Sequence, residues 1–192
     1  MLNLPRKMVV FDIECTTWEG AAARNWSGSG ECRELVQIGA VLLRTRNFKE
    51  LGVFQTLVKP KLNPILSDHF INLTHITQAE VNERGLVFPL VLEDFYRWCG
   101  NAELYCFDKI GISRLFDRDV LIENCEMWGV EFPFEMEQFH NINEIFFSHG
   151  YVVEQSGAAP KAFGLEIPAR PHNALNDVRG LTLALRALKA RS

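Results

Sequence analysis

The chain has 192 residues, 47% of them hydrophobic, and a mean hydropathy of −0.03, values typical of a single globular domain that spans residues 1–192 and needs no disulfide bonds. No apolar run approaches the ~20 residues of a membrane-spanning helix, and residues 1–7 lack the features of a signal peptide. A net charge of −4 argues against broad contacts with the phosphates of duplex nucleic acid, but not against an enzyme that grips a strand end through bound metal ions.

The five cysteines are scattered along the chain and form no C-x-x-C pair. Cysteines with this distribution are typical of reduced thiols in a cytoplasmic protein, where they serve mainly as packing groups. We therefore expect a cytoplasmic location and neither a zinc site nor a disulfide framework. The cysteines are Cys15, Cys32, Cys99, Cys106 and Cys125.

The N-terminal half is predicted to form three strands at residues 7–14, 35–43 and 51–58, because these runs are rich in β-branched and aromatic residues. A short polar turn separates the last two strands, which indicates a hairpin. Residues 16–33 form a polar, glycine-containing loop that is long enough to suggest a functional segment. Residues 59–73 contain prolines and are expected to be irregular or to include a short helix.

Helices alternate with a short strand in the second half of the chain. Thr77 and Glu80 have the spacing of a capping box, and Pro89 and Gly100 stand where a helix begins and ends. The predicted helices cover residues 77–83, 89–99, 114–128, 141–149 and 173–190, and the strand covers residues 103–107. A strand meander followed by alternating helix and strand predicts an α/β domain, with a mixed sheet flanked by helices.

Two carboxylates end the first strand, in the run Phe11-Asp12-Ile13-Glu14. Since alternate side chains of a strand share a face, Asp12 and Glu14 point the same way. Two like charges at this spacing raise each other's pKa, which a fold tolerates poorly unless a cation neutralises them. Hard oxygen ligands of this kind suit Mg²⁺ or Mn²⁺. The alternative is an acidic pair exposed to solvent at a strand end.

A histidine and an aspartate near the C-terminus form a second candidate pair. His172 and Asp177 are five residues apart, which on an ideal helix separates them by about 140°. They converge if His172 lies in the preceding loop and Asp177 in the first turn, an arrangement that Pro171 and an Asn173 cap favour. A histidine beside metal-bound carboxylates is suited to act as a general base. The alternative is a polar capping cluster.

A further carboxylate comes from the predicted helix at residues 114–128. Asp117 opens this helix and has an apolar residue four positions later. Acidic side chains at a helix start also interact favourably with the helix dipole, so the pattern alone does not identify a ligand. Asp119 and Asp108 remain competitors for the same role.

Segments from nearly the whole chain match one family pattern in the correct order. They are residues 11–20 (FDIECTTWEG), 35–41 (LVQIGAV), 58–60 (VKP), 70–81 (FINLTHITQAEV) and 172–177 (HNALND). With these segments the chain resembles the DEDDh (DnaQ-like, ribonuclease T superfamily) 3′–5′ exonucleases, most closely the enhancer-of-RNAi-type and KinA sporulation-inhibitor-type enzymes. The resemblance implies a ribonuclease H-like mixed five-stranded sheet flanked by helices, the DnaQ-like exonuclease fold.

The resemblance also implies a function, namely metal-dependent hydrolysis of the 3′-terminal phosphodiester of RNA or single-stranded DNA with release of 5′-mononucleotides. Two Mg²⁺ or Mn²⁺ ions would straddle the scissile phosphate. The catalytic and metal-binding roles would fall to the residues already singled out, with His172 as the base and the ligands Asp12, Glu14, Asp117 and Asp177. The matching segments further imply substrate contacts from Cys15, Thr16, Trp18, Leu73, Thr74 and Ile76.

Some of these implied substrate contacts have a structural alternative. Leu73, Thr74 and Ile76 are suited to press on the last base and sugar, since single strands are recognised by stacking and pocket contacts. Core packing beneath a loop is the alternative for all three. Trp18 is a candidate for base stacking, and its alternative is to anchor the loop in which it lies.

The chain departs from the family pattern in several places. The family has Trp-Gly just before its second-motif acid, whereas Leu-Phe precedes Asp117 here. His75 replaces the glycine of the family's L-T-G-I-T segment, Gln37 replaces a glutamate, and the usual H-R-A-x-D-D reads H-N-A-L-N-D. The altered second motif motivates an alternative function, a catalytically weakened module that binds nucleic-acid ends. A metal-dependent endonuclease is a third hypothesis, and the choice between RNA and DNA and the oligomeric state stay open.

Overall fold

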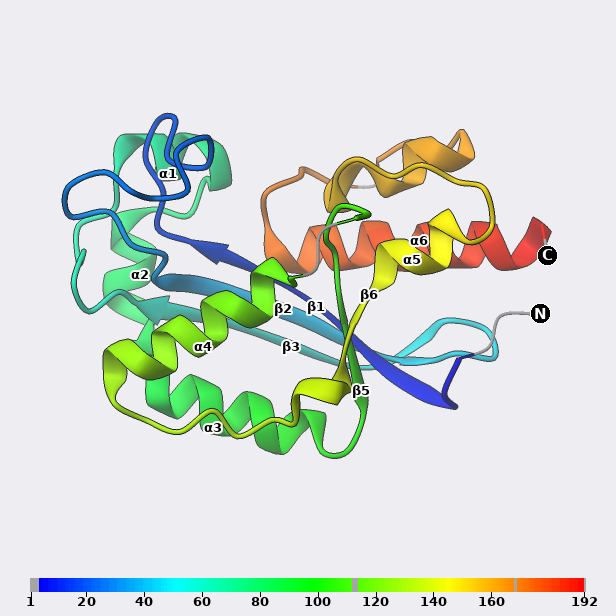
Figure 1. The fold of residues 1–192 in the computed structure, drawn as a ribbon, viewed down its shortest axis with the longest axis horizontal. Coiled ribbons are helices and arrows are strands. Elements are labelled where there is room, and N and C mark those ends of the chain that lie inside the picture. The colour runs from blue at the N-terminus through cyan, green and yellow to red at the C-terminus, as the bar shows by residue number, and fades with distance from the viewer. Residues whose placement is uncertain (1–3, 112–113, 168, 192) are drawn as a thin grey trace.

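The computed structural model describes residues 4–111, 114–167 and 169–191. A mixed β-sheet forms the centre of the fold (Figure 1). The sheet has six strands in the order β4-β3-β2-β1-β5-β6. Strands β1, β2 and β3 pair antiparallel, whereas β5 runs parallel to β1 and β6 parallel to β5. The strands are β1 (Lys7–Cys15), β2 (Leu35–Arg44), β3 (Lys49–Lys59), β4 (Leu86–Val87), β5 (Glu103–Cys106) and β6 (Phe139–Asn141).

The predicted α/β class and mixed sheet are confirmed, but the sheet has six strands where five were expected. The two edge strands account for the difference. Strand β4 has two residues and β6 has three, so neither is long enough to show an alternating pattern in the sequence. Their pairing depends on neighbouring strands that the sequence alone does not place beside them.

Helices cover both faces of the sheet (Figure 1). Helices α3 and α4 pack against one face, and α5, α6 and the 3₁₀ helix η2 pack against the other. The helices are α1 (Asp68–Thr74), α2 (Gln78–Arg84), α3 (Phe88–Cys99), α4 (Phe116–Trp128), η1 (Met136–Gln138), α5 (Ile142–Phe147), η2 (Ser156–Phe163) and α6 (Ala174–Arg191). In the described part of the chain, no helix combines the length and apolar character that crossing a bilayer requires.

Capping residues fix several helix ends where the sequence predicted them. The Thr77 hydroxyl accepts from the N–H of Glu80, and the Glu80 carboxylate accepts from the N–H of Thr77, so the capping box of α2 is confirmed. Helix α3 has proline in its first turn, as predicted. The helix predicted at residues 141–149 is shorter, because α5 covers only Ile142–Phe147. All five cysteines are free, and four of them are buried.

Strand β1 alternates between the two halves of the core, and this alternation positions the functional site. Val9 and Phe11 pack with α3 and α4, whereas Met8 and Val10 pack with α5 and α6. Because the side-chain period of a strand is two, Asp12 and Glu14 follow Met8 and Val10 on the side that faces α6. The strand thus places two carboxylates at its C-terminal end, where the apolar core on that side ends.

The N-terminus of α6 rests directly on strand β2. The backbone N–H of Ala174 donates to Gln37 Oε1 at 2.9 Å. Gly39 makes this close approach possible, because a Cβ atom at this position would lie 2.3 Å from the backbone nitrogen of Leu175. The first turn of α6 is therefore held beside the C-terminal end of β1.

We expect Gly39→Ala to lower the free energy of unfolding by about 1–3 kcal/mol, because the added methyl group overpacks a contact between two backbones. Gly180→Ala is a matched control. Its Cβ would meet no atom closer than 3.5 Å, and alanine favours a helix more than glycine does, so stability should stay equal or rise by up to about 1 kcal/mol. Urea denaturation followed by circular dichroism measures both. Equal effects of the two substitutions would contradict the account of the β2–α6 contact.

Candidate active site

Four buried carboxylates and one histidine line a single pocket of about 350 Å³ at the end of β1, which the half-buried Asp108 and the exposed Glu154 also line. Strand β1 supplies the first two carboxylates, and the first turns of α4 and α6 supply one each. The carboxylates belong to Asp12, Glu14, Asp117 and Asp177, and the histidine is His172. The prediction that the two strand carboxylates share a face agrees with this arrangement. All four acids are buried, with 5–9% of each residue exposed.

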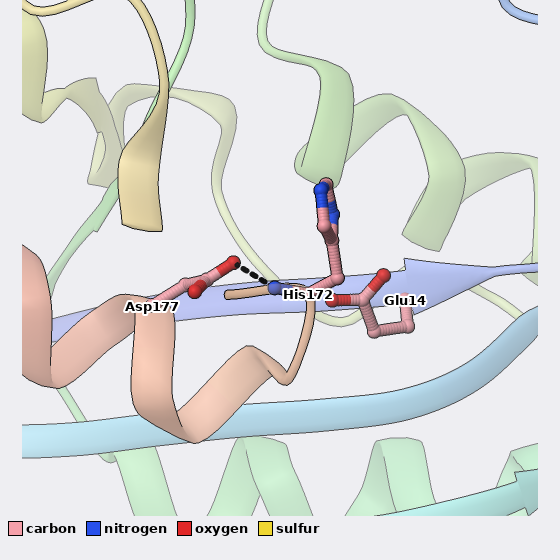
Figure 2. Close-up of side chains that lie close together, drawn as sticks. All are labelled: Glu14, His172 and Asp177. Carbon is pink, nitrogen blue, oxygen red and sulfur yellow. Dashed lines mark hydrogen bonds between the residues drawn. The ribbon is translucent and has the colours of Figure 1, made fainter. Parts of the chain in front are cut away.

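His172 and Asp177 converge because the histidine lies in the loop before α6, as the sequence predicted. The backbone N–H of His172 donates to Asp177 Oδ2 at 3.1 Å (Figure 2). One potential ligand atom from each of Glu14, His172 and Asp177 lies within 4.8 Å of the others. The predicted Asn173 cap is also present, since its Oδ1 accepts from the N–H of Asn176 at 3.3 Å.

The backbone of His172 adopts a left-handed conformation, with φ of +61°. Side chains other than glycine rarely adopt this conformation, and it costs on the order of 1 kcal/mol or more. The hydrogen bond from its N–H to the carboxylate of Asp177 offsets part of that cost and holds the loop. The loop therefore presents the imidazole to the pocket at the expense of backbone strain.

The structure separates the three candidates for the second-motif acid. Both carboxylate oxygens of Asp108 accept backbone hydrogen bonds, one from the N–H of Phe116 at the start of α4. Asp119 forms an ion pair with Arg118 and does not line the pocket. Only Asp117 has a buried oxygen, Oδ2, that lacks a hydrogen-bond partner. Asp117 is thus the one with an oxygen available inside the pocket.

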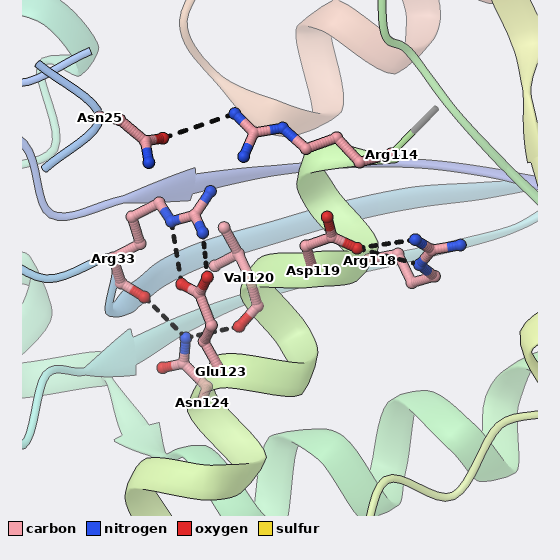
Figure 3. Close-up of polar contacts among 8 residues, drawn as sticks. All are labelled: Asn25, Arg33, Arg114, Arg118, Asp119, Val120, Glu123 and Asn124. Atoms are coloured by element: carbon pink, nitrogen blue, oxygen red, sulfur yellow. Dashed lines mark hydrogen bonds and ion pairs between the residues drawn. The ribbon is translucent and has the colours of Figure 1, made fainter. Parts of the chain in front are cut away.

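An aromatic and cationic cluster connects residues 16–34 to the start of α4. The ring of Phe116 lies 5.6 Å from that of Trp26, and the Arg33 guanidinium lies 5.1 Å from the Phe116 ring. Arg33 Nε also donates to Glu123 on α4 at 2.9 Å (Figure 3). The buried amide of Asn124 donates to the carbonyl of Arg33, which adds a second tie between the segments. These contacts hold the start of α4 in place, in a chain that lacks the Trp-Gly pair before the family's second-motif acid.

Burial raises the pKa of all four buried carboxyl groups, and repulsion by neighbouring charges adds to the rise for Asp12, Glu14 and Asp117. The pKa of Asp12 is raised by burial first and then by the charges of Asp117, Asp177 and Glu14. Burial first, and then the charges of Asp177 and Asp117, raise the pKa of Glu14 to about 8. Burial raises the pKa of Asp177 to about 6 and that of Asp117 in the same direction. The site therefore holds less negative charge at neutral pH than its four acids would carry in water.

The donor set fits divalent cations that prefer oxygen ligands. Among the described residues, no lysine or arginine forms an ion pair with any of the four acids. Asp117 Oδ2 and Asp177 Oδ1 are buried without a hydrogen-bond partner. A buried carboxylate oxygen is usually paired, and Mg²⁺ or Mn²⁺ is the kind of partner that satisfies several such oxygens at once.

A second pocket of about 340 Å³ adjoins the carboxylates and shares Glu14 and His172 with them. Three of the predicted substrate contacts line it: Cys15, Trp18 and Leu73. The other three do not. Thr16 is buried, and its hydroxyl donates to the carbonyl of Cys32 and accepts from the N–H of Glu34.

The remaining two predicted contacts, Thr74 and Ile76, line a third pocket instead. Both side chains are buried, and Ile76 packs in a small apolar cluster with Phe70 and Val81. Between them, His75 has φ of +60° and ends α1 in a left-handed conformation. Glycine favours that conformation, and here the exposed histidine adopts it and lines the third pocket.

The sequence reasoning missed the start of η2, which forms one wall of the carboxylate pocket. The side chain of Ser156 forms a hydrogen bond to Asp12, which offsets part of the rise in the pKa of that carboxyl group. A Cβ at Gly157 would lie 2.5 Å from Asp177 Oδ1, so only glycine fits against this carboxylate. No periodicity marks this segment, and its glycine is the one local signal that the sequence offers.

The chain matches known proteins along most of its length. Residues 9–185 match the model of the RNase T family, described as exonuclease. A 3′-5′ exoribonuclease 1 from Rattus norvegicus is 28% identical over 191 residues, which cover 94% of this chain and 52% of that protein. An ERI1 exoribonuclease 2 from Homo sapiens is 25% identical over 195 residues, which cover 92% of this chain and 27% of that protein. The chain spans about half or less of the length of these relatives.

Solved structures share the fold. The nuclease domain of 3′hExo, a DEDDh family member bound to rAMP, aligns with a TM-score of 0.77 at 24% identity and covers 96% of this chain and 92% of that one. E. coli exonuclease I in complex with a dA16 oligonucleotide aligns with a TM-score of 0.67 at 11% identity, and the alignment covers 97% of this chain and 41% of that one. This likeness confirms the DnaQ-like exonuclease fold.

The raised pKa of Glu14 predicts how the stability of the metal-free protein depends on pH. The folded state holds the proton more tightly than the unfolded state, in which the pKa is near 4.5. The associated stability is present below pH 4.5 and is lost as the pH rises through about 8. In EDTA at pH 8, the free energy of unfolding of Glu14→Gln should therefore exceed that of the wild type by on the order of 2 kcal/mol. This is the scale of removing an unpaired buried charge.

Urea denaturation at pH 4.5 and pH 8 measures this difference. Glu83→Gln is the control, because Glu83 is exposed on α2 and lies outside the pocket. The control should leave the pH dependence of stability unchanged. Parallel pH profiles for the wild type and Glu14→Gln would show that the repulsion among the four acids does not limit stability.

Proposed function

The chain belongs to the exonuclease family, and we propose from this membership that it is a metal-dependent 3′–5′ exonuclease. It would hydrolyse the 3′-terminal phosphodiester bond of RNA or single-stranded DNA and release 5′-mononucleotides. One observation carries the proposal. Four buried carboxylates from three separate elements meet a histidine in one pocket, and two of their oxygens have no partner.

The four acids would hold two Mg²⁺ or Mn²⁺ ions, with Asp12 and Glu14 contributing from β1 and the others from the helix starts. Ions bound there supply a lowered pKa for the attacking water and stabilise the charge that develops on the leaving 3′ oxygen. The pairing of Ser156 with Asp12 and the contact of Gly157 with Asp177 keep both carboxylates in place. Positions fixed before substrate arrives are what charge stabilisation in a transition state requires.

His172 would act as the general base that accepts the proton of the attacking water. Burial lowers the pKa of its imidazole, so the ring is neutral and able to accept a proton near neutral pH. The ring lines both the carboxylate pocket and the adjoining pocket. It therefore lies between the acids and the space assigned to the terminal nucleotide.

The pocket that adjoins the carboxylates would accept the terminal base and sugar. Its wall includes Trp18, Leu73 and Phe116, which offer apolar and aromatic surface to a nucleobase. Two relatives are named exoribonucleases, and a structural neighbour was solved with rAMP. These names favour RNA as the substrate, with single-stranded DNA as the second choice.

We expect Asp12→Asn and Asp117→Asn each to reduce nucleotide release by roughly 10²-fold or more, the scale of losing a group that stabilises transition-state charge. Asp119→Asn is the matched control, because Asp119 pairs with Arg118 and does not line the carboxylate pocket. An ion pair of this kind contributes little, so activity should change by no more than about threefold. Shortening of 5′-end-labelled RNA and DNA strands of matched sequence, with Mg²⁺ and with Mn²⁺, measures the effects.

Three outcomes would contradict the proposal. Unchanged nucleotide release by the Asp12→Asn variant would contradict the metal-binding role of the acids. A wild type that binds single strands but releases nothing would be a binding module. Cleavage of a circular single strand would show an endonuclease, because an exonuclease needs an end.

A further inference from the structure

One end of the sheet carries a concentration of positive charge that the proposed reaction does not use. The hairpin between β2 and β3 lies at this end, opposite the arrowhead of β1 (Figure 1). Residues 4–11 and 41–49 contain no aspartate or glutamate, so the net charge of −4 conceals an uneven distribution. The exposed cations of these two segments, named the basic end, are Arg6, Lys7, Arg44, Arg46 and Lys49.

Three of these cations lie side by side in adjacent strands. Lys7 pairs with Arg44 in the register of β1 and β2, and Arg44 pairs with Lys49 in the register of β2 and β3. Directly opposite residues of antiparallel strands have Cβ atoms about 5 Å apart, and like charges at such positions destabilise a sheet. The row of three cations therefore lowers the stability of the fold, so stability does not explain its presence.

No acidic side chain of the described residues neutralises the basic end. None of its five cations forms an ion pair with a described aspartate or glutamate. Two acids occupy adjoining positions, and both have other partners. Glu50 pairs with Arg179, and Glu103, which lies opposite Met8 in β5, forms a hydrogen bond with His140. The basic end is therefore available to a negatively charged ligand.

Helix α6 holds the hairpin in place and adds two further cations beside it. Arg186 Nε and Nη2 both donate to the carbonyl of Phe48, at 3.0 and 2.7 Å. Lys189 Nζ donates to the carbonyls of Thr45 and Arg46. Neutral carbonyl groups engage these two side chains without cancelling their charge, so the hairpin is both fixed and more positive. Groups that are fixed in advance lose less conformational entropy when a ligand binds.

The composition of the basic end suits a chain of phosphates better than a protein surface. The cores of protein interfaces are enriched in aromatic residues and methionine and depleted of lysine. Among the large apolar side chains of residues 4–11 and 41–50, none is exposed. Lysine and arginine side chains are, by contrast, among the main donors to the phosphate oxygens of nucleic acids.

The basic end and the carboxylate pocket lie at opposite ends of β1. Lys7 begins this strand and Glu14 lies near its other end, seven residues further on. At about 3.3 Å per residue of a strand, the two residues are about 23 Å apart. A stacked nucleic-acid strand rises about 3.4 Å per nucleotide, so this separation corresponds to roughly seven nucleotides.

We propose that the basic end is an exosite that binds backbone phosphates of the substrate strand, upstream of its 3′ end. The proposal rests on the proposed exonuclease function, because the carboxylate pocket holds the 3′ end while the basic end holds the same strand roughly seven or more nucleotides away. Two linked contacts hold a strand more tightly than either contact alone. The exosite selects long strands without reading their sequence, since phosphates carry no sequence information.

Fluorescence anisotropy of 5′-fluorescein oligouridylates of two lengths tests the exosite in an Asp12→Asn background, which spares the strand. A strand of about twenty nucleotides reaches the basic end, whereas a tetranucleotide is too short. Replacement of Lys7, Arg44 and Lys49 together by glutamine should weaken binding of the long strand about tenfold. It should also reduce the slope of log K against log salt by about 2, at about 0.7 for each phosphate contact. Binding of the tetranucleotide should stay unchanged.

Stability and a matched lysine separate the loss of a contact from the loss of the fold. The triple variant should unfold at an equal or higher urea concentration than its parent, because the substitutions remove a row of like charges. Lys59→Gln is the matched control, because Lys59 is exposed at the other end of the same strand as Lys49. Lys49→Gln should lower the salt slope for the long strand by about 0.7, and Lys59→Gln should leave it unchanged.

Equal salt slopes for the triple variant and its parent on the long strand would overturn the exosite. An equal loss of affinity for both lengths would also overturn it, because the effect would then lie at the reaction site. Binding to vesicles that contain phosphatidylserine, lost in the triple variant while long-strand binding is kept, would assign the basic end to an anionic lipid surface instead. Failure of the exonuclease function would look different. The protein without the Asp12 substitution would then release no nucleotide, while the length dependence of binding would still decide the exosite.

Discussion

Mutual repulsion among four buried carboxylates is the constraint on which the rest of this structure depends. The acids stand close enough to raise one another's pKa, and no basic side chain of the described residues pairs with them. A fold keeps such an arrangement only if the surrounding packing is stronger than the repulsion. Strand β1 provides that packing, because its apolar residues are buried in clusters on both faces of the sheet.

The two helices that contribute acids are held at their N-termini, where the helix dipole favours negative charge. Helix α6 is fixed on β2 through Gly39 and the amide of Gln37. Helix α4 is fixed to residues 16–34 through the contacts of Phe116 with Trp26 and Arg33. Backbone dipoles and packing together stabilise the acids without an ion pair to any lysine or arginine of the described residues, and one oxygen each of Asp117 and Asp177 stays without a partner.

Local sequence periodicity was sufficient to predict the parts of the site that depend on one element. The shared face of Asp12 and Glu14 follows from the two-residue period of a strand, and the approach of His172 to Asp177 follows from cap chemistry at a helix start. The family resemblance supplied the order of the motifs. The sequence did not decide between Asp117 and Asp108, because that choice depends on which carboxylate accepts the N–H groups at the start of α4.

Features that depend on contacts between distant segments were beyond the sequence. Ser156 and Gly157 reach the acids only because η2 packs against α6, and no periodic pattern records that contact. The two short edge strands depend on neighbours in the same way. The predicted substrate contacts of residues 73–76 were divided between two pockets for a related reason, since the chain ends α1 and reverses at His75.

Gln37 pairs with Glu14 in the sheet and also lines the third pocket, and its identity has consequences for both places. A glutamate at this position, as in the family pattern, would accept the N–H of Ala174 equally well but would add an anion near four others. The amide keeps the hydrogen bond that seats α6 and removes that charge. Its amide also lines the third pocket, to which a glutamate would have added an anion. One neutral side chain thus positions the start of α6 without adding a charge to the carboxylate pocket or to the third pocket.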